Sequence, residues 1–243
     1  VWTVLILIKK QLKKIENQLT WENFDQNIFN LFEKNEAISP LGQIKLSNYK
    51  IKNKADGHEK YNKIIINNWI NGNFIKSDEK YIIKNYSHLF NENAQITRLN
   101  NLIWKKKWSS ANRQLKRVNK KIKLLTSAKI KLARRQYGVD NAIQNVPREF
   151  LNDEGLIYER VKWRRKSGLD EESYALLKAY LMNNNIQVTK PDIWWKEIYW
   201  HTRNLFNKKK YNDAYELLNH HKQTKISNRA NAEWFLGWLA LRF

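Results

Sequence analysis

Cysteine is absent from this sequence, and proline and glycine are scarce. Without a thiol, the chain can form neither a disulfide framework nor a thiolate metal site. Only 7 Gly and 3 Pro interrupt its 243 residues, which favours helices over a turn-rich β fold. The sequence also shows no glycine-rich nucleotide loop, no internal β pattern and no low-complexity tail. These absences together predict an all-α protein.

Long hydrophobic runs are missing as well. The only apolar run, Val1–Ile8, is less than half of the roughly 20 residues needed to cross a bilayer. It has no basic segment before it and no small-residue cleavage site after it, so it is not an intact signal peptide. We therefore predict no membrane span.

Acidic residues are outnumbered by basic ones. The chain has 45 Lys and Arg against 23 Asp and Glu, which gives a formal net charge of +22. Such a charge indicates attraction to a polyanion or an anionic surface. Lys, Asn and Ile are abundant together, however, as expected when AT-rich coding biases a whole proteome, and this weakens the charge as evidence for a particular ligand.

Several local signals mark helix ends. Ser39 followed by Pro40 indicates a helix N-terminus, because the hydroxyl accepts an orphan amide and proline fits the first helical position. Gly72 follows an apolar helical pattern where a left-handed C-terminal residue is expected. Asp78 and Glu79 fall in the first turn of the next helix, where the helix dipole favours carboxylates.

A unit of helix, short turn and helix recurs along the chain. In the second helix of the unit, a small residue lies between two large ones. The spacing places the small residue against the partner helix. The positions are Trp108–Ala111–Leu115, Tyr211–Ala214–Leu217 and, more loosely, Leu169–Ser173–Leu176. Two of the intervals fit paired-helix repeats of the tetratricopeptide-like kind, since Phe74 and Trp108 are 34 residues apart and Leu169 and Tyr211 are 42 apart. The strict signature of that repeat is absent. We expect residues 1–243 to form a single α-solenoid domain, a right-handed α-superhelix of stacked helix pairs.

The last helix expected from the pattern is apolar on two sides. One stripe is Ala232, Phe235, Leu236, Leu239 and Phe243, and the other is Trp234, Trp238 and Leu241. We expect such a helix to be packed on both sides. Gly237, in its middle, is expected to let a neighbouring helix come close.

This last stretch also carries a resemblance. The run AEWFLGWLALRF, Ala232–Phe243, resembles the AEWLAGWIALRF-type segment of the helical N-terminal region of soluble lytic murein transglycosylases, bacterial enzymes that cleave the glycan strands of peptidoglycan. Further similar segments lie upstream in the order of the family: Arg98–Ala111, Lys131–Pro147, Gly155–Leu177, Trp194–Phe206 and, more weakly, Ile66–Tyr86. Their structural signature residues are Trp104, Trp108, Trp163, Trp194, Trp234, Gly237, Trp238 and Arg242.

The resemblance implies a non-catalytic superhelical scaffold that carries a catalytic domain. The parent enzyme would cleave the β-1,4 bond between N-acetylmuramic acid and N-acetylglucosamine and leave a 1,6-anhydro end. The implied location is the periplasm, and the implied partners are peptidoglycan glycan strands and the parent enzyme's own catalytic domain. In the family that domain follows this region, so we expect it C-terminal to residue 243.

The catalytic motif of the family is not matched here. The family uses a Glu followed by a Ser, and further downstream a Gly-Leu-Met-Gln segment. Glu172 and Ser173 form the only Glu-Ser pair, but no such segment follows, and Met182 is the only methionine. We interpret Glu172 as a solvated residue in the first turn of a helix. The resemblance implies that the parent enzyme is a lyase acting on murein, but we predict no catalytic residue in this chain and no activity of the chain alone.

The histidines predict no metal site. His220 and His221 are adjacent, so on a helix they diverge by about 100°. The other histidines, His58, His88 and His201, have no Asp or Glu at ligand spacing. We therefore expect surface or packing histidines, no metal and no cofactor.

Two segments mix basic and aromatic residues, Trp104–Trp108 and Arg160–Lys166. They could form a polyanion surface, with rings stacking on sugars or bases and cations meeting carboxylates or phosphates. Alternatively, the tryptophans pack in the core and the cations are the solvated face of the same helices. Helical spacing favours packing for Trp104, Trp108 and Trp194. The candidate glycan-contact or domain-interface residues are Arg160, Lys162, Arg164 and Arg165.

Two other functions compete with the scaffold of a murein enzyme. A nucleic-acid-binding helical repeat would suit the charge, but RNA readers of this kind need equivalent side chains in every repeat, and no such series is found. Nucleic acid is therefore not favoured as a partner. A peptide-binding scaffold of the tetratricopeptide sort is the second alternative, which fold alone leaves open.

Overall fold

The computed structural model describes residues 2–22, 26–35, 37–53 and 57–242. Within these ranges the regular structure is helical and contains no strand, which confirms the all-α prediction. Contacts divide the chain into two compact units, Val1–Ile122 and Lys123–Phe243, and the boundary falls in the first turn of one helix. A single superhelical domain over residues 1–243 stays a prediction.

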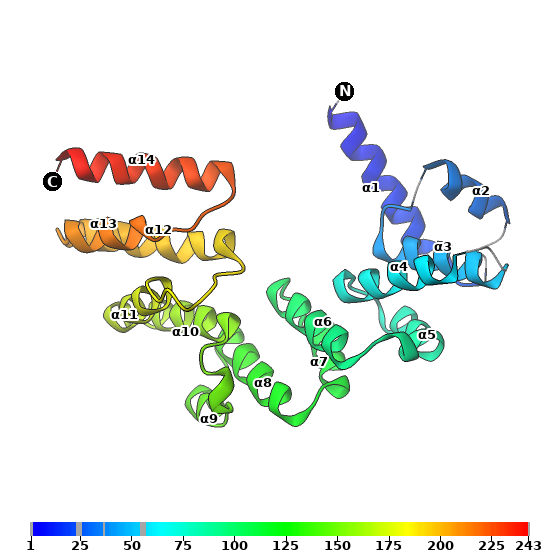
Figure 1. Ribbon diagram of the computed structural model, residues 1–243, viewed down its shortest axis with the longest axis horizontal. Helices are drawn as coiled ribbons and strands as arrows, with labels where there is room; N and C mark the ends of the chain where they lie inside the picture. Colours follow the sequence, from blue (N-terminus) through cyan, green and yellow to red (C-terminus); the bar gives the residue numbers. More distant parts are fainter. Residues whose placement is uncertain (1, 23–25, 36, 54–56, 243) are drawn as a thin grey trace. The chain divides into compact units, whose positions relative to one another are not determined.

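Unit 1 consists of consecutive helices joined by short connections (Figure 1). They are α1 (Trp2–Gln18), α2 (Gln26–Asn35), α3 (Pro40–Lys52), α4 (His58–Asn71), α5 (Lys76–Tyr86), η1 (Ser87–Leu89), α6 (Glu92–Trp104), α7 (Trp108–Gln114) and η2 (Leu115–Arg117). The helix α3 begins as its sequence predicts, because Ser39 Oγ accepts a hydrogen bond of 2.9 Å from the Gly42 amide. The main core of the unit surrounds the fully buried Trp69, whose ring stacks on Phe74 and Phe90.

Unit 2 continues in the same manner. It holds most of α8 (Lys120–Arg134), then α9 (Val139–Gln144), η3 (Arg148–Phe150), α10 (Glu154–Lys166), α11 (Asp170–Leu181), α12 (Pro191–Asn207), α13 (Tyr211–Asn219) and α14 (Ile226–Arg242). Consecutive pairs α10–α11 and α12–α13 pack on each other, and α12 also contacts both α10 and α14. Trp194 is fully buried here, with its ring stacked on Tyr180 and edge-on to Tyr158.

Three hairpins, α6–α7, α10–α11 and α12–α13, turn in the same way. In each, the C-cap residue that follows the first helix is succeeded by a residue with positive φ. The third residue, the N-cap of the next helix, has φ −88° and ψ between 63° and 66°. The triplets are Lys105–Lys106–Lys107, Ser167–Gly168–Leu169 and Lys208–Lys209–Lys210. The amide of the third residue donates to the carbonyl five residues back, at 2.8, 3.0 and 2.9 Å respectively. This is the Schellman arrangement that satisfies orphan carbonyls at a helix end.

The small residues of the hairpins are buried as predicted. Ala111, Ser173 and Ala214 each lie five residues after the positive-φ residue, and each is fully buried. A small side chain at this position lets the two helices approach closely. The pattern that the sequence showed only loosely at Ser173 is therefore the same structural position.

Two glycine predictions are wrong. Gly72 has φ −82° and ψ 156°, an extended rather than a left-handed conformation. Glycine suits this position for space, because a Cβ atom there would lie 2.7 Å from the Asn68 carbonyl oxygen. At Gly237 a Cβ atom would meet no atom within 4 Å, so the close helix approach expected there does not occur among the described residues.

The second apolar stripe of α14 is packed only at Trp238, whose half-buried ring lies 5.2 Å from that of Phe206. Trp234 is 69% exposed and Leu241 is 90% exposed, whereas Ala232, Phe235 and Leu239 of the first stripe are buried. The reason is that α14 contacts α12 and α13 on one side only. Packing on both sides was therefore a wrong prediction for the described residues, and Phe243 lies outside them.

Candidate functional site

The basic segment Arg160–Lys166 forms the second half of α10. The helix is anchored at its start by Asp153, whose Oδ1 accepts a hydrogen bond of 2.9 Å from the Leu156 amide. Because α-helical neighbours lie three or four residues apart, Arg160 and Arg164 share a face. The four candidate cations of this segment consequently have different surroundings.

Lys162 and Arg165 are paired within the protein. The Lys162 ammonium forms an ion pair with Glu159 on the same helix. The Arg165 guanidinium binds both carboxylate oxygens of the fully buried Glu197, with Nε to Oε2 at 2.6 Å and Nη2 to Oε1 at 3.0 Å. The hydrogen bond to Glu197 raises the pKa of Arg165. Arg165 therefore links α10 to α12, and a glycan contact by Lys162 or Arg165 stays a prediction.

Arg160 and Arg164 line a pocket of about 300 Å³ between α8, α9 and α10. The remaining lining residues are Leu132, Val139, Asp140, Ile143, Gln144 and Trp163. Trp163 also packs against the core that Leu132 and Val139 help to form. The pocket therefore combines an apolar floor, one ring and two guanidinium groups.

Arg160 differs from the other three candidate cations in its electrostatic surroundings. Burial lowers the pKa of Arg160, and the nearby Arg164 lowers it further. Within the described residues Arg160 has neither a hydrogen bond nor an ion pair, whereas Arg164 donates from Nη1 to the Glu172 carbonyl oxygen at 3.1 Å. The exposed Asp140 supplies the one carboxylate of the lining. A half-buried guanidinium without an acceptor is suited to an external anion.

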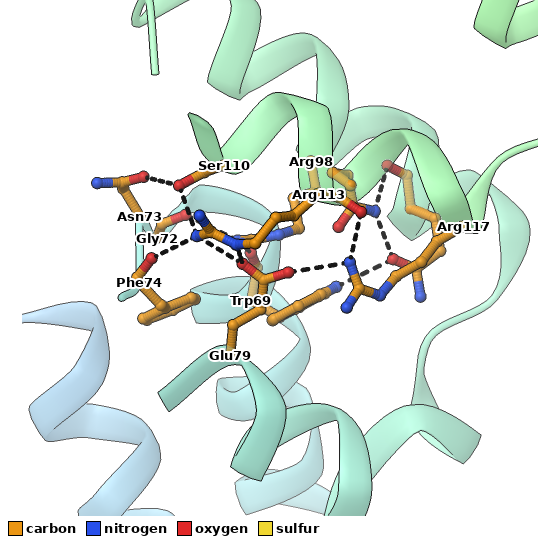
Figure 2. Close-up of polar contacts among 11 residues, drawn as sticks. Trp69, Gly72, Asn73, Phe74, Glu79, Arg98, Ser110, Arg113 and Arg117 are labelled. Carbon is orange, nitrogen blue, oxygen red and sulfur yellow. Dashed lines mark hydrogen bonds and ion pairs between the residues drawn. The ribbon is translucent and has the colours of Figure 1, made fainter. Parts of the chain in front are cut away.

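Unit 1 contains a second arginine cluster, which Figure 2 shows in close-up. Arg113 donates from Nε to Glu79 Oε2 at 2.9 Å and from Nη2 to the Phe74 carbonyl and Ser110 Oγ, each at 3.0 Å. Arg117 donates from Nη1 to Glu79 Oε1 at 2.9 Å. Glu79 thus joins the start of α5 to α7 and η2, and its carboxylate neutralises part of a larger positive charge.

Arg98 is the most deeply buried member of this cluster. Its Nη1 donates to the carbonyl oxygens of Trp69 and, at 2.7 Å, of Gly72 (Figure 2), while its Cζ lies 3.8 Å from the centre of the Trp69 ring. Among the residues that the structure describes, none forms a hydrogen bond with Arg98 Nε or Nη2. Burial lowers the pKa of Arg98 to about 9, an effect that Glu79 opposes, so the group is still charged at neutral pH. Arg98 caps the carbonyl end of α4, where a helix dipole favours a cation.

Arg98, Arg160 and His201 occupy the same position in the three hairpins, eight residues before the residue with positive φ. His201 is buried and shares a 2.9 Å hydrogen bond with Ser173 Oγ. Because the Ser173 hydroxyl donates its only hydrogen to the Val161 carbonyl at 2.8 Å, His201 Nε2 is the donor in this contact. Burial first, and then Arg165 and Lys208, lower the pKa of His201 to about 4.

The tryptophans of the signature have diverse surroundings. Trp194 is fully buried, so its predicted packing role is confirmed, and its Nε1 donates to Glu154 Oε1 at 3.0 Å. Trp104, Trp108, Trp163 and Trp238 are half-buried. Trp234 and Arg242 are exposed.

An open groove of about 430 Å³ lies between α12 and α14. Its aromatic members include Tyr199, Phe206, Trp234 and Trp238, and the rings of the two tryptophans are 6.5 Å apart with planes 11° from parallel. The Arg203 guanidinium lies 5.8 Å from the centre of the Tyr199 ring. This groove is accessible, and it combines aromatic rings with the polar side chains of Arg203, Asn207 and Asn231.

The remaining candidates for chemistry lie apart from one another. Glu172 is exposed in the first turn of α11, as predicted. Among the described residues no three His, Cys, Asp or Glu side chains are grouped so that they could hold a metal ion.

Sequence reasoning missed the buried pairs Glu79–Arg113, Glu79–Arg117 and Glu197–Arg165. Glu79 was assigned only to a first helical turn, and Glu197 was given no role. One signal was present, since these partners are 34, 38 and 32 residues apart, close to the interval between repeats. Lys and Arg are so abundant here, however, that this interval alone selects no pair.

A comparison of the chain with protein-family models, with curated proteins and with solved structures finds no match to any of them. Within the described part of the chain, no helix has the length and apolar character needed to cross a membrane.

Proposed function

We propose that this chain is a non-catalytic helical-repeat scaffold of a peptidoglycan lytic transglycosylase, which carries a catalytic domain and guides anionic glycan strands in the periplasm. In this proposal the helix pairs stack as a tetratricopeptide-like α-solenoid. Its partners are murein strands and the catalytic domain of the parent enzyme.

One observation carries the proposal. The resembling segments Arg98–Ala111, Gly155–Leu177 and Trp194–Phe206 fall on the three hairpins that share one turn geometry. The similarity therefore follows a repeated structural unit and is not scattered over unrelated positions. Polar contacts within each unit support the same reading, because Lys208–Glu171, Lys178–Glu216 and Arg113–Glu79 join residues 34 to 38 positions apart.

Retention on intact peptidoglycan sacculi tests the glycan-guiding role. The purified chain is mixed with sacculi over a salt series, with nucleic acid as competitor. Binding that survives about 0.2–0.3 M salt and resists the competitor supports the proposal, since plain polyanion attraction is much weaker at that ionic strength. Release at lower salt would remove the guiding role and leave only a scaffold.

A matched pair of variants separates specific contact from total charge. The double variant Arg160→Gln/Arg164→Gln and the control Lys166→Gln/Lys196→Gln each remove two positive charges, and the two control lysines are exposed. We expect the first to lose retention and the second to keep it. Equal loss in both would assign the binding to net charge.

The absence of catalysis is tested separately. The chain alone should release no 1,6-anhydro product from sacculi, and measurable release would contradict the proposed non-catalytic role. Retention on RNA in preference to sacculi at the same salt would instead favour a nucleic-acid-binding repeat, while a saturable peptide partner would favour a peptide-binding scaffold.

A further inference from the structure

Arg160 has no hydrogen-bond acceptor among the described residues, whereas Arg98, which occupies the same hairpin position in unit 1, has two. At the same hairpin position, Arg98 donates to the carbonyls of Trp69 in α4 and of Gly72, which directly follows α4. Arg160 faces α8 and α9 instead, and no described residue accepts a hydrogen bond from it. The position therefore takes an acceptor from the protein in one hairpin and presents a free guanidinium to a pocket in another.

The charges of the lining residues limit which ligand can accept hydrogen bonds from Arg160. The charged side chains of the lining are Arg160, Arg164 and Asp140, two positive and one negative. A ligand with one negative charge would balance them, whereas a chain of successive phosphates would also meet the Asp140 carboxylate. A carboxylate further matches the planar fork of a guanidinium, which binds it through two parallel hydrogen bonds.

The other lining residues indicate which kind of uncharged group the ligand carries beside its carboxylate. Leu132, Val139 and Ile143 form an apolar floor, Trp163 contributes a ring, and Gln144 adds an amide that can both donate and accept. The volume of about 300 Å³ is at the lower end for small-molecule sites and suits a single sugar-sized group.

We propose that this pocket binds a monocarboxylate carried on a sugar-sized body, with Arg160 as the main partner of the carboxylate and Arg164 as the second. The choice of an N-acylated amino sugar that bears a lactyl carboxylate rests on the proposed function. The site itself rests on the geometry of Arg160.

The test compares two soluble sugars that differ in this carboxylate. Titration of the full chain with N-acetylmuramic acid, followed by NMR, should shift the amides of residues 139–144 and 160–164. N-Acetylglucosamine, which lacks the lactyl carboxylate, should bind at least about tenfold more weakly. Arg160→Gln should weaken N-acetylmuramic acid about 10- to 100-fold, and Arg160→Lys less, because it keeps the charge but loses the fork.

Lys166→Gln is the matched control, since it removes one exposed charge from the same helix. Its affinity should stay within about twofold of the unaltered chain. Equal binding of the two sugars, shifts located elsewhere, or an Arg160→Gln variant that is folded and binds normally would overturn the assignment. Tighter binding of a dinucleoside monophosphate than of N-acetylmuramic acid would overturn it in favour of a phosphodiester. Sugar binding at the pocket without retention on sacculi would refute the glycan-guiding role and leave the carboxylate site intact.

Discussion

Glu79 in unit 1 and Glu197 in unit 2 are both buried carboxylates that join helices through arginine, yet their surroundings differ. Glu79 accepts hydrogen bonds from Arg113 and Arg117, and Arg98 adds a third guanidinium to the cluster. Within the described ranges, the hydrogen bonds to the Glu197 carboxylate come from Arg165, which binds both oxygens. Positive charge is thus in excess around Glu79 and balanced around Glu197.

The difference extends to the equivalent hairpin position. Arg98 occupies it beside Glu79, and His201 occupies it beside Arg165 and Glu197, one turn after the glutamate on α12. The backbone turn and the buried small residue are nevertheless the same in both hairpins. Close packing and the turn therefore define the hairpin, whereas the ionic partners differ from one hairpin to the next.

The largest expected effect is from removing the carboxylate in unit 1. Glu79→Gln should lower the free energy of unfolding by about 3–5 kcal/mol, because three guanidinium groups lose their common counter-charge. Glu197→Gln should cost less, about 2–3 kcal/mol, since it leaves one cation and the amide oxygen can still accept from Arg165. Urea unfolding at pH 7, followed by tryptophan fluorescence, measures both.

Glu59→Gln serves as the control for these two variants. Its side chain is 83% exposed in a pair with Lys63, so the cost should be below about 0.5 kcal/mol. If Glu197→Gln proved more damaging than Glu79→Gln, the excess of charge around Glu79 would not govern stability.

The next largest effect is a pH dependence of stability caused by His201, which occupies the same hairpin position as Arg98. The unfolded histidine has a pKa near 6.5, and burial lowers that of His201 to about 4. Between these values the unfolded chain binds the proton more readily, so stability present above pH 6.5 is lost as the pH falls to 4. The full loss is about 3 kcal/mol. Arg98, with a pKa of about 9, contributes no such change in that range.

The measurement is the free energy of unfolding at several pH values from 7 to 4. His201→Gln should make the decline shallower than in the unaltered chain, whereas His58→Gln, at an exposed helix start, should leave the slope as it is. An unchanged slope in His201→Gln would show that His201 is protonated in the folded protein at higher pH.

Substitutions at the shared turn should have smaller effects of opposite sign. Lys106 and Lys209 adopt φ of 56° and 60°, where glycine is favoured, and Gly168 has φ of 79°. Lys106→Gly and Lys209→Gly should each stabilise by about 0.5–1 kcal/mol, and Gly168→Lys should destabilise by about 1 kcal/mol. Thermal unfolding detects these shifts. The same sign at all three positions would mean that the turns are not equivalent.

The smallest effect is expected on the open face of α14. Trp234→Ala should change the free energy of unfolding by no more than about 0.5 kcal/mol, because the ring is mostly exposed. Chemical denaturation provides the value. A loss above about 2 kcal/mol would show that this face is packed in solution, as the sequence pattern predicted.

The sequence predicted local features well. The helix start at Ser39–Pro40, the buried small residues at Ala111 and Ala214, and the packing of Trp194 all follow from spacing and from the chemistry of single residues. Of the four candidate cations, the sequence could not say that Arg165 and Lys162 are paired inside the protein. Glu159 lies three residues before Lys162 on the same helix, so their spacing permits the pair, but spacing alone does not select it in a lysine-rich sequence. The partner of Arg165, Glu197, is on another helix, and only the packing of α10 against α12 brings the two together.

The sequence by itself determined that the chain is helical, where many helices begin, and that pairs of helices recur. Few glycines and prolines, apolar spacing and caps act within a few residues, so they can be read along the chain. Only the tertiary structure decided that Gly72 provides space rather than a left-handed turn, that Arg98 is buried on Trp69, and that Arg160 faces a pocket. These outcomes depend on which atoms of distant helices come within a few ångströms, and packing alone sets those distances.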